Sequence, residues 1–271
     1  MFFQVTSEKC NMDGICVLEC PARILEMTGQ GPVMQEGGAD ICIRCGHCVA
    51  VCPEAAVKLD FLSPDDCIEI DRGQLPDANQ AELFLRSRRS IRSYRKKPMP
   101  KEDLEHALAI ASCAPTGSNR QPVKWLVFHD RKDVEVIAGH VVDWMRYVLA
   151  NHPEVAATFN MERILSDVAS GIDRICRHAP HLVFAYASKE SGVASADCHT
   201  AIAYLELVLP SLDAGSCWAG YVNFAASQWP PLAEFLALPE GFLFHGAVMV
   251  GYPKFHYHRI PPRKLPDIVY R

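Results

Sequence analysis

Residues 42–53 read CIRCGHCVAVCP, and residues 10–21 read CNMDGICVLECP. The first of these stretches has the spacing of an iron–sulfur loop, with three cysteines separated by two residues each and a fourth before a proline. In such loops three thiolates hold one cluster, and the cysteine before the proline binds the other cluster. Corresponding cysteines of the two stretches lie 32 positions apart. We therefore expect an internal repeat with pseudo-twofold symmetry.

The complete stretch predicts a [4Fe–4S] cluster. Its first three cysteines are expected to bind this cluster together with the last cysteine of the other stretch. The predicted ligands are Cys20, Cys42, Cys45 and Cys48. Paired cysteines of this kind also bind zinc, but the third cysteine and the Cys-Pro ending exceed what a tetrahedral zinc site needs.

The second predicted cluster differs in one ligand. Its expected thiolates are Cys10, Cys16 and Cys52, and Asp13 stands where a fourth thiolate belongs. A carboxylate oxygen is a harder donor than a thiolate, so it holds iron less firmly. The sequence leaves open whether this site carries a [4Fe–4S] cluster with Asp13 as a ligand or a [3Fe–4S] cluster.

Length and charge predict two domains. The chain has 271 residues, of which 49% are hydrophobic, so it can bury more core than a small electron carrier needs. Residues 1–72 carry twelve acidic and five basic side chains, a net charge of −7, and residues 73–271 carry a net charge of +2. A polar, turn-rich passage joins them. We predict an iron–sulfur domain over residues 1–72 and a second domain over residues 73–271.

Several classes of partner are not expected from the composition. The opening residues 1–10 have neither the apolar run of a signal peptide nor that of a membrane anchor. No basic stripe with interleaved aromatic residues predicts nucleic-acid binding. Free thiols and oxygen-sensitive clusters favour the cytoplasm. The cysteines outside the two stretches are expected to be buried small hydrophobic residues: Cys67, Cys113, Cys176, Cys198 and Cys217.

The second domain has the mixed periodicities of an α+β fold. Helical spacing of apolar residues predicts helices in the segments 77–87, 100–112, 134–150, 161–176 and 194–209. Runs rich in β-branched and aromatic residues predict strands in the segments 125–129, 182–187 and 242–251. Glu206 and Pro210 interrupt the most apolar of the helices, so a transmembrane span is not expected.

Two polar segments of this domain are candidates for ligand binding. Residues 88–94 read RRSIRSY, a dense group of donors that either binds an anion such as phosphate or forms a solvated face. Residues 113–122 read CAPTGSNRQP, in which Pro115 and Gly117 end the preceding helix. This loop either donates hydrogen bonds to a planar heterocycle or is an ordinary connection to the next strand.

Together these segments resemble the nitroreductase superfamily of FMN oxidoreductases, whose hallmarks include an RRSxRxY/F run followed by an APSGxNxQPW-like loop. The resemblance covers about residues 76–271 and extends to the motifs at 179–186, 214–220, 251–254 and 261–266. Val123 departs from the family, which often has Trp there. The first segment resembles bacterial two-cluster ferredoxins, so the whole chain looks like a ferredoxin-fused nitroreductase.

The resemblance assigns roles to individual residues. It implies that Arg88, Ser90 and Arg92 contact the phosphate, ribityl chain and pyrimidine edge of FMN, with Arg89 as a further candidate. The C-terminal residues Arg263 and Lys264 are expected to return to the phosphate. Backbone of Gly220 is expected to approach the flavin near N5, where a side chain would obstruct it. The residues expected to reach the flavin from the other subunit are Pro115, Thr116, Gly117 and Asn119.

The family fold implies a mainly antiparallel sheet wrapped by helices, in an intertwined homodimer with FMN at the interface. Chemistry is expected at FMN N5, and no side chain is predicted to be catalytic. The implied donor is NAD(P)H or reduced ferredoxin, and the implied acceptor is a small molecule such as a nitroaromatic compound or a quinone. Two alternatives are a flavin reductase and a redox sensor or electron-storage protein without a dedicated substrate.

Overall fold

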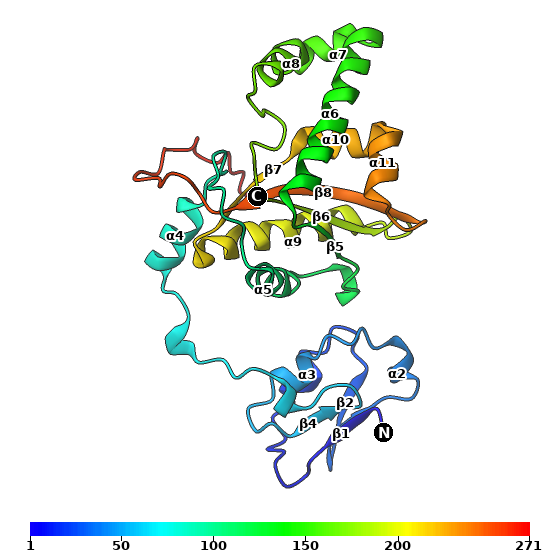
Figure 1. Cartoon of the computed structure of the whole chain (residues 1–271). Helices are drawn as coiled ribbons and strands as arrows, with labels where there is room; N and C mark the ends of the chain where they lie inside the picture. Colours follow the sequence, from blue (N-terminus) through cyan, green and yellow to red (C-terminus); the bar gives the residue numbers. More distant parts are fainter. The chain divides into compact units, whose positions relative to one another are not determined.

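The computed structural model describes residues 1–271 and divides into two compact units (Figure 1). Unit 1 comprises Met1–Pro76 together with Ser118–Arg120, and unit 2 comprises Asp77–Gly117 and Gln121–Arg271. The two units are described separately below. The division into domains at residue 72 remains our sequence-based proposal.

Unit 1 consists of two small antiparallel sheets and three one-turn helices around a common core. Strand β1 (Phe3–Val5) pairs with β4 (Val57–Leu59), and β2 (Leu25–Thr28) pairs with β3 (Gly31–Met34). The helices are α1 (Ile15–Leu18), α2 (Gly38–Ile41) and α3 (His47–Ala50), and two 3₁₀ turns follow, η1 (Pro64–Asp66) and η2 (Arg72–Gln74). Apolar side chains of the strands pack against several of the cysteines, so the cluster loops are part of the core.

The cysteine loops of unit 1 repeat the same backbone conformation 32 residues apart. Helices α1 and α3 begin after Gly14 and Gly46, whose φ angles are 73° and 72°. Met12 and Arg44 occupy the left-handed region at φ 60° and 52°. Non-glycine residues rarely adopt this conformation, so its recurrence at the same offset reflects a shared loop geometry. The predicted internal repeat is confirmed.

The core of unit 2 is a four-stranded sheet in the order β5-β6-β8-β7, with every neighbouring pair antiparallel. The strands are β5 (Lys124–Phe128), β6 (His181–Ser188), β7 (Gly215–Trp218) and β8 (Phe242–Gly251). The predicted α+β class and its mainly antiparallel sheet are confirmed. The sequence did not predict the edge strand β7.

Helices cover both faces of this sheet (Figure 1). Successive side chains of a strand point to opposite faces. Leu182 and Phe184 of β6 join one buried cluster with α6, α10 and α11, whereas Val183 and Ala185 join the other with α5 and α9. Burial on both sides explains why β6 and β8 read as nearly continuous apolar runs.

The five predicted helices of unit 2 are present as α4, α5, α6, α8 and α9, with some differences at their ends, and the sequence did not predict α7, α10 and α11. Their bounds are α4 (Ala78–Ser87), α5 (Lys101–Ala111), α6 (Arg131–Asn151), α7 (Pro153–Thr158), α8 (Met161–Ala169), α9 (Ala194–Val208), α10 (Gly220–Gln228) and α11 (Pro230–Leu236), with 3₁₀ turns η3 (Gly117–Asn119) and η4 (Leu209–Leu212). None is both long and apolar enough to cross a membrane.

The prediction that a helix runs from residue 161 to residue 176 is wrong at its C-terminal end. Helix α8 stops at Ala169, and Gly171 follows with a φ of 83°. Beyond it, the Asp173 carboxylate accepts hydrogen bonds from the backbone N–H groups of Ile175, Cys176 and His178 at 2.8–2.9 Å. These bonds hold residues 173–178 as a compact loop, because they satisfy backbone donors without a helix.

His181 fastens the start of β6 to two neighbouring segments. Its Nε2 accepts a hydrogen bond from the Met99 N–H at 2.9 Å, so Nδ1 carries the proton and donates to the His129 carbonyl at 2.8 Å. The ring stacks on that of His129 at 4.3 Å. Burial lowers the pKa of His181 from 6.5 to about 4, so the buried ring is neutral.

We expect His181 to make the free energy of unfolding fall by about 1 kcal/mol between about pH 7.5 and pH 5.5. Its folded-state pKa of about 4 lies below the ordinary value of 6.5, so the unfolded chain takes up the proton first as the pH falls. His181→Gln keeps a donor and an acceptor but does not titrate. Anaerobic urea unfolding at both pH values measures the difference, with the exposed His152→Gln as the control. An unchanged pH dependence in His181→Gln would contradict the assignment.

Candidate functional site

The cysteine loops of unit 1 gather their thiols into two groups. Burial raises the pKa of the Cys48 thiol to about 12, and the neighbouring thiols that add to this effect are Cys45, Cys20 and Cys42. Burial likewise raises the pKa of the Cys16 thiol, and the neighbouring side chains that add to this effect are Cys52, Asp13 and Cys10. The structure thus brings together the two sets of side chains that the sequence predicted as ligands.

Within these groups, no three His, Cys, Asp or Glu side chains are arranged to hold a single metal ion. A [4Fe–4S] cluster takes one ligand for each iron, so its cysteines need to surround a space and not one atom. The space beside Cys42, Cys45 and Cys48 is a small apolar cavity whose wall also contains Cys20.

Asp13 occupies the position that Cys45 has in the other repeat. Its Oδ1 accepts a hydrogen bond from the Ile15 N–H at 3.0 Å, and its own N–H donates to Asn11 Oδ1 at 3.2 Å. Asp13 therefore closes a local turn onto Ile15, the first residue of α1, whose N-cap residue is Gly14.

In unit 2, the RRSIRSY segment lies extended along the edge strand β7. The Ile91 N–H donates to the Ser216 carbonyl at 2.8 Å, and the buried Tyr94 hydroxyl donates to the Ile91 carbonyl at 2.8 Å. A Cβ atom at Gly215 would overlap the Ile91 side chain, so glycine is needed for this close approach. These contacts fix the backbone from which Arg88, Ser90 and Arg92 project.

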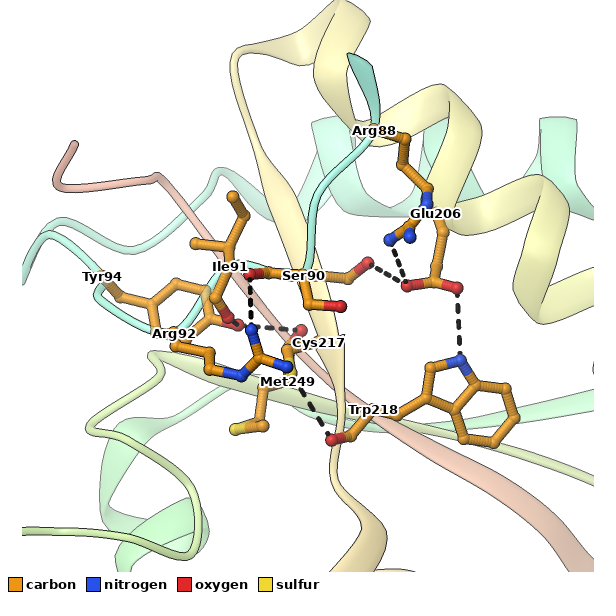
Figure 2. A network of polar contacts seen from close by, with 10 residues as sticks. Arg88, Ser90, Ile91, Arg92, Tyr94, Glu206, Cys217, Trp218 and Met249 are labelled. Atoms are coloured by element: carbon orange, nitrogen blue, oxygen red, sulfur yellow. Dashed lines mark hydrogen bonds and ion pairs between the residues drawn. The ribbon is translucent and has the colours of Figure 1, made fainter. Parts of the chain in front are cut away.

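Glu206 of α9 connects this segment to β7 (Figure 2). Its Oε1 accepts from Arg88 Nη1 at 3.4 Å and from the Ser216 hydroxyl at 3.3 Å, and its Oε2 accepts from the Trp218 indole N–H at 3.2 Å. The Glu206 side chain is only 11% exposed. A half-buried Arg88 is thereby held in place by a charged acceptor.

The structure gathers part of the predicted cofactor set around two hollows. Arg88 and Arg89 line a hollow of about 190 Å³ together with Ser216 and His256. Arg92 lines a separate hollow of about 230 Å³ with Gly220 and Trp218. Arg263 and Lys264 lie in the exposed, irregular C-terminal tail and line neither hollow.

The polar loop after α5 is held by a buried carboxylate. The Gly117 N–H donates to Asp197 Oδ1 at 3.0 Å, and the Gln121 N–H donates to the Thr116 hydroxyl at 3.0 Å. Asp197 in α9 is buried, and its Oδ2 has no hydrogen-bond partner in the chain. Pro115 is exposed beside this anchored turn.

Sequence reasoning missed three groups at these hollows. In the sequence, Glu206 only interrupts an apolar helix, Arg174 falls within the helix predicted over residues 161–176, and Arg177 directly follows that helix. Their position on the wall of the Gly220 hollow depends on the loop after α8, for which Gly171 and Asp173 are the available signals. The exposed Cys113 also corrects the expectation that all the remaining cysteines are buried; Cys176, Cys198 and Cys217 are buried, and Cys67 is half-buried.

Two family models match separate parts of the chain. The nitroreductase family model matches residues 85–252, and the 4Fe-4S dicluster domain model matches residues 3–53. The "Putative NADH dehydrogenase/NAD(P)H nitroreductase" of Archaeoglobus fulgidus is 26% identical over 190 residues, which covers 69% of this chain and 95% of the relative. Iodotyrosine deiodinase of Thermotoga neapolitana is 24% identical over 178 residues, covering 63% and 87%.

A solved structure shows the same fold. The nitroreductase with bound FMN from Bacteroides fragilis superposes with a TM-score of 0.58 at 21% identity, covering 71% of this chain and all of that chain. The two family matches define an oxidoreductase with an iron–sulfur module. The chain belongs to the nitroreductase family of FMN-dependent oxidoreductases and carries an N-terminal 4Fe-4S dicluster domain, which confirms the predicted resemblance.

We expect Glu206→Ala to lower the free energy of unfolding by about 2–3 kcal/mol, because three donors lose a buried charged acceptor. The donors are Arg88, Ser216 and Trp218. Urea unfolding measures the loss. Glu234→Ala, an exposed glutamate of α11, is the matched control and should change stability by less than about 0.5 kcal/mol. Equal stability of the two variants would show that Glu206 does not hold the segment.

Proposed function

We propose that the chain is an FMN-dependent oxidoreductase in which electrons pass between the iron–sulfur clusters and FMN and reduce a nitroaromatic compound, a quinone or a related unsaturated acceptor. The observation that carries this proposal is the hollow at Gly220, where Arg92 meets the exposed aromatic side chains of Trp218 and Phe224. Such a hollow offers a cation and flat apolar walls to a planar ligand.

The residues at this hollow fit a bound flavin. Gly220 begins α10, its φ is not in the left-handed region, and a Cβ atom there would meet nothing within 4 Å. The chain's own packing therefore gives no reason for glycine, whereas close approach of a ligand does. Arg92 has no ion-pair partner, and its guanidinium donates only a 3.5 Å contact to the Ser90 carbonyl. It is available for an acceptor on the pyrimidine edge.

We infer that the phosphate of FMN binds beside Arg88 and Arg89. In a single chain this hollow also contains Glu206 and Asp213, so its two arginines are balanced by two carboxylates. Additional positive charge would strengthen phosphate binding here. Arg263 and Lys264 are the proposed source of that charge.

A homodimer is proposed as the functional form, with the loop residues Pro115, Thr116, Gly117 and Asn119 reaching the partner's flavin. Helix α4 has no buried residue, and Leu83 is 62% exposed. The tail exposes Leu265 at 92% and Tyr270 at 89%. Apolar side chains so exposed are expected to be covered by another surface. A monomer that binds FMN fully would contradict this proposal.

The proposed cluster ligands are the two groups of side chains already described. Cys20, Cys42, Cys45 and Cys48 hold one [4Fe–4S] cluster, and Cys10, Cys16 and Cys52 hold the other cluster beside Asp13. Because Asp13 Oδ1 accepts from the Ile15 N–H, its second oxygen is the one available to a fourth iron. Iron and acid-labile sulfide analysis distinguishes a four-iron from a three-iron site, and zinc without sulfide would contradict both.

When bound, FMN would supply the two-electron chemistry, and the protein would supply position, charge and exclusion of water. NAD(P)H and reduced ferredoxin are the proposed donors. The open aromatic walls at Trp218 and Phe224 favour a small-molecule acceptor over a redox sensor with a closed flavin face.

We expect Gly220→Val to weaken FMN binding by about tenfold or more, equivalent to about 1.4 kcal/mol, because a branched side chain would occupy the space proposed for the ring. The fold should tolerate the change, since this space is empty within the chain. Quenching of FMN fluorescence on titration into apoprotein measures the affinity. Gly139→Val, at another helical glycine with open space around it, is the matched control. Equal FMN affinity in both variants would contradict the proposed position of the flavin ring beside Gly220.

Loss of a cluster ligand tests the electron relay. We expect Cys48→Ser to retain FMN but to bleach it at least about tenfold more slowly when reduced ferredoxin is the donor, because an oxygen ligand holds cluster iron less well than a thiolate. Anaerobic stopped-flow absorbance measures the rate. The control is Cys113→Ser, at an exposed cysteine outside both loops. A full bleaching rate in a cluster-deficient Cys48→Ser protein would rule out the relay.

A further inference from the structure

The hollow at Gly220 contains two arginines that the proposed cofactor does not use. Arg174 and Arg177 line it together with Arg92, and its remaining walls include Trp218, Tyr221 and Phe224. No acidic residue lines this hollow. Three arginines therefore line the same space of about 230 Å³.

Only one of these three cations has a counter-charge. Arg174 Nη1 donates to Asp167 Oδ2 at 2.6 Å. Arg92 and Arg177 form no ion pair, although both lie close enough to Cys217 to lower its pKa against the raising effect of burial. Two unpaired guanidinium groups at one hollow repel each other, and an anion between them would relieve that repulsion.

The loop after α8 presents Arg177 to the hollow in a constrained conformation. Arg177 and His178 have φ angles of 54° and 55°, which non-glycine residues rarely adopt. The Asp173 carboxylate holds this turn through backbone N–H groups on either side of Arg177. The side chain is thus carried by a loop fixed from within, as expected for a group that must meet a ligand in one place.

FMN accounts for the other arginines but not for these two. Its phosphate is assigned to the separate hollow of Arg88 and Arg89, and its pyrimidine edge is assigned to Arg92. What remains at the Gly220 hollow is positive charge next to aromatic walls. Phe224, one of these walls, is supported by Phe159 at a ring distance of 5.5 Å.

We propose that the electron acceptor is a planar aromatic molecule that carries a carboxylate, with Arg177 binding the carboxylate and Arg174 adding positive charge beside it. Arginine matches a carboxylate with two parallel hydrogen bonds, and the aromatic walls contact the ring of the acceptor. This inference rests on the proposed function and narrows its class of substrate.

The test compares para-nitrobenzoate with nitrobenzene, which share a ring and a nitro group and differ in the carboxylate. The full-length holoprotein is used as wild type, Arg177→Ala and Arg177→Lys. Arg163→Ala, at an exposed arginine of α8, is the matched control. The measurements are the dissociation constant of each acceptor from the oxidised holoprotein by calorimetry, the kinetic constants KM and kcat for each acceptor, and the FMN content.

We expect Arg177→Ala to weaken the binding of para-nitrobenzoate by about tenfold or more and to raise its Michaelis constant by the same factor, with nitrobenzene changed by less than about twofold. Arg177→Lys should fall between wild type and Arg177→Ala, because it keeps the charge and loses the second hydrogen bond. FMN content and the values for Arg163→Ala should match wild type.

Three results would overturn the inference. They are equal losses for both acceptors, a loss of FMN from Arg177→Ala, and weaker binding of para-nitrobenzoate than of nitrobenzene to the wild type. Failure of the proposed function has a different signature. If neither acceptor is reduced but para-nitrobenzoate binds in an Arg177-dependent way, the anion site stands and the redox role fails.

Discussion

Glu206 is the constraint on which the architecture of the nitroreductase domain's site depends. One carboxylate on α9 accepts from a side chain of the RRSIRSY segment and from two side chains of β7. The Ser216 hydroxyl is buried, so without Glu206 it would lose this hydrogen bond without replacement by water. The hydrogen bonds of Glu206 therefore connect the RRSIRSY segment to α9 and to the edge strand β7.

The same helix also anchors the polar loop after α5, the second segment proposed to bind FMN. Asp197, nine positions before Glu206 on α9, accepts from the Gly117 N–H of the polar loop. Two acids of α9 thus hold the two segments that carry the family's sequence hallmarks. An apolar residue at either place would suit the packing of α9 but would leave backbone or guanidinium donors unpaired.

The sheet and most helices are predictable because their burial is periodic. Strands β6 and β8 are covered on both faces, so an apolar run marks each of them, and the apolar spacing of α5 and α9 marks helices that cover one face. Edge strand β7 escapes prediction because Gly215–Trp218 is short and contains neither periodicity nor a run of β-branched residues. The prediction for α8 is too long because Ile175 and Cys176 are buried and continue the helical spacing, although Asp173 satisfies their backbone donors in a loop.

The sequence predicts those candidate site residues that lie in contiguous motifs. It does not predict the two arginines of the α8–β6 loop, Arg174 and Arg177, because they lie outside any such motif. Both arginines line the same hollow as Arg92, some eighty residues earlier in the chain, and only Arg174 has a carboxylate partner. A cation is ordinary on a surface, but an unpaired cation beside another one is unfavourable. No local sequence pattern predicts that these arginines lie at the same hollow.

The two repeated cysteine loops share a backbone conformation and differ in one side chain at the proposed ligand positions. Asp13 and Cys45 occupy equivalent places in loops of the same backbone conformation, so the sequence offset alone identifies their equivalence. The Asp13 carboxylate accepts a hydrogen bond from the Ile15 N–H, and a carboxylate is a stronger acceptor than the sulfur of cysteine. One loop conformation therefore carries two different side chains, and at this position the two proposed cluster sites differ in the side chain and not in the backbone.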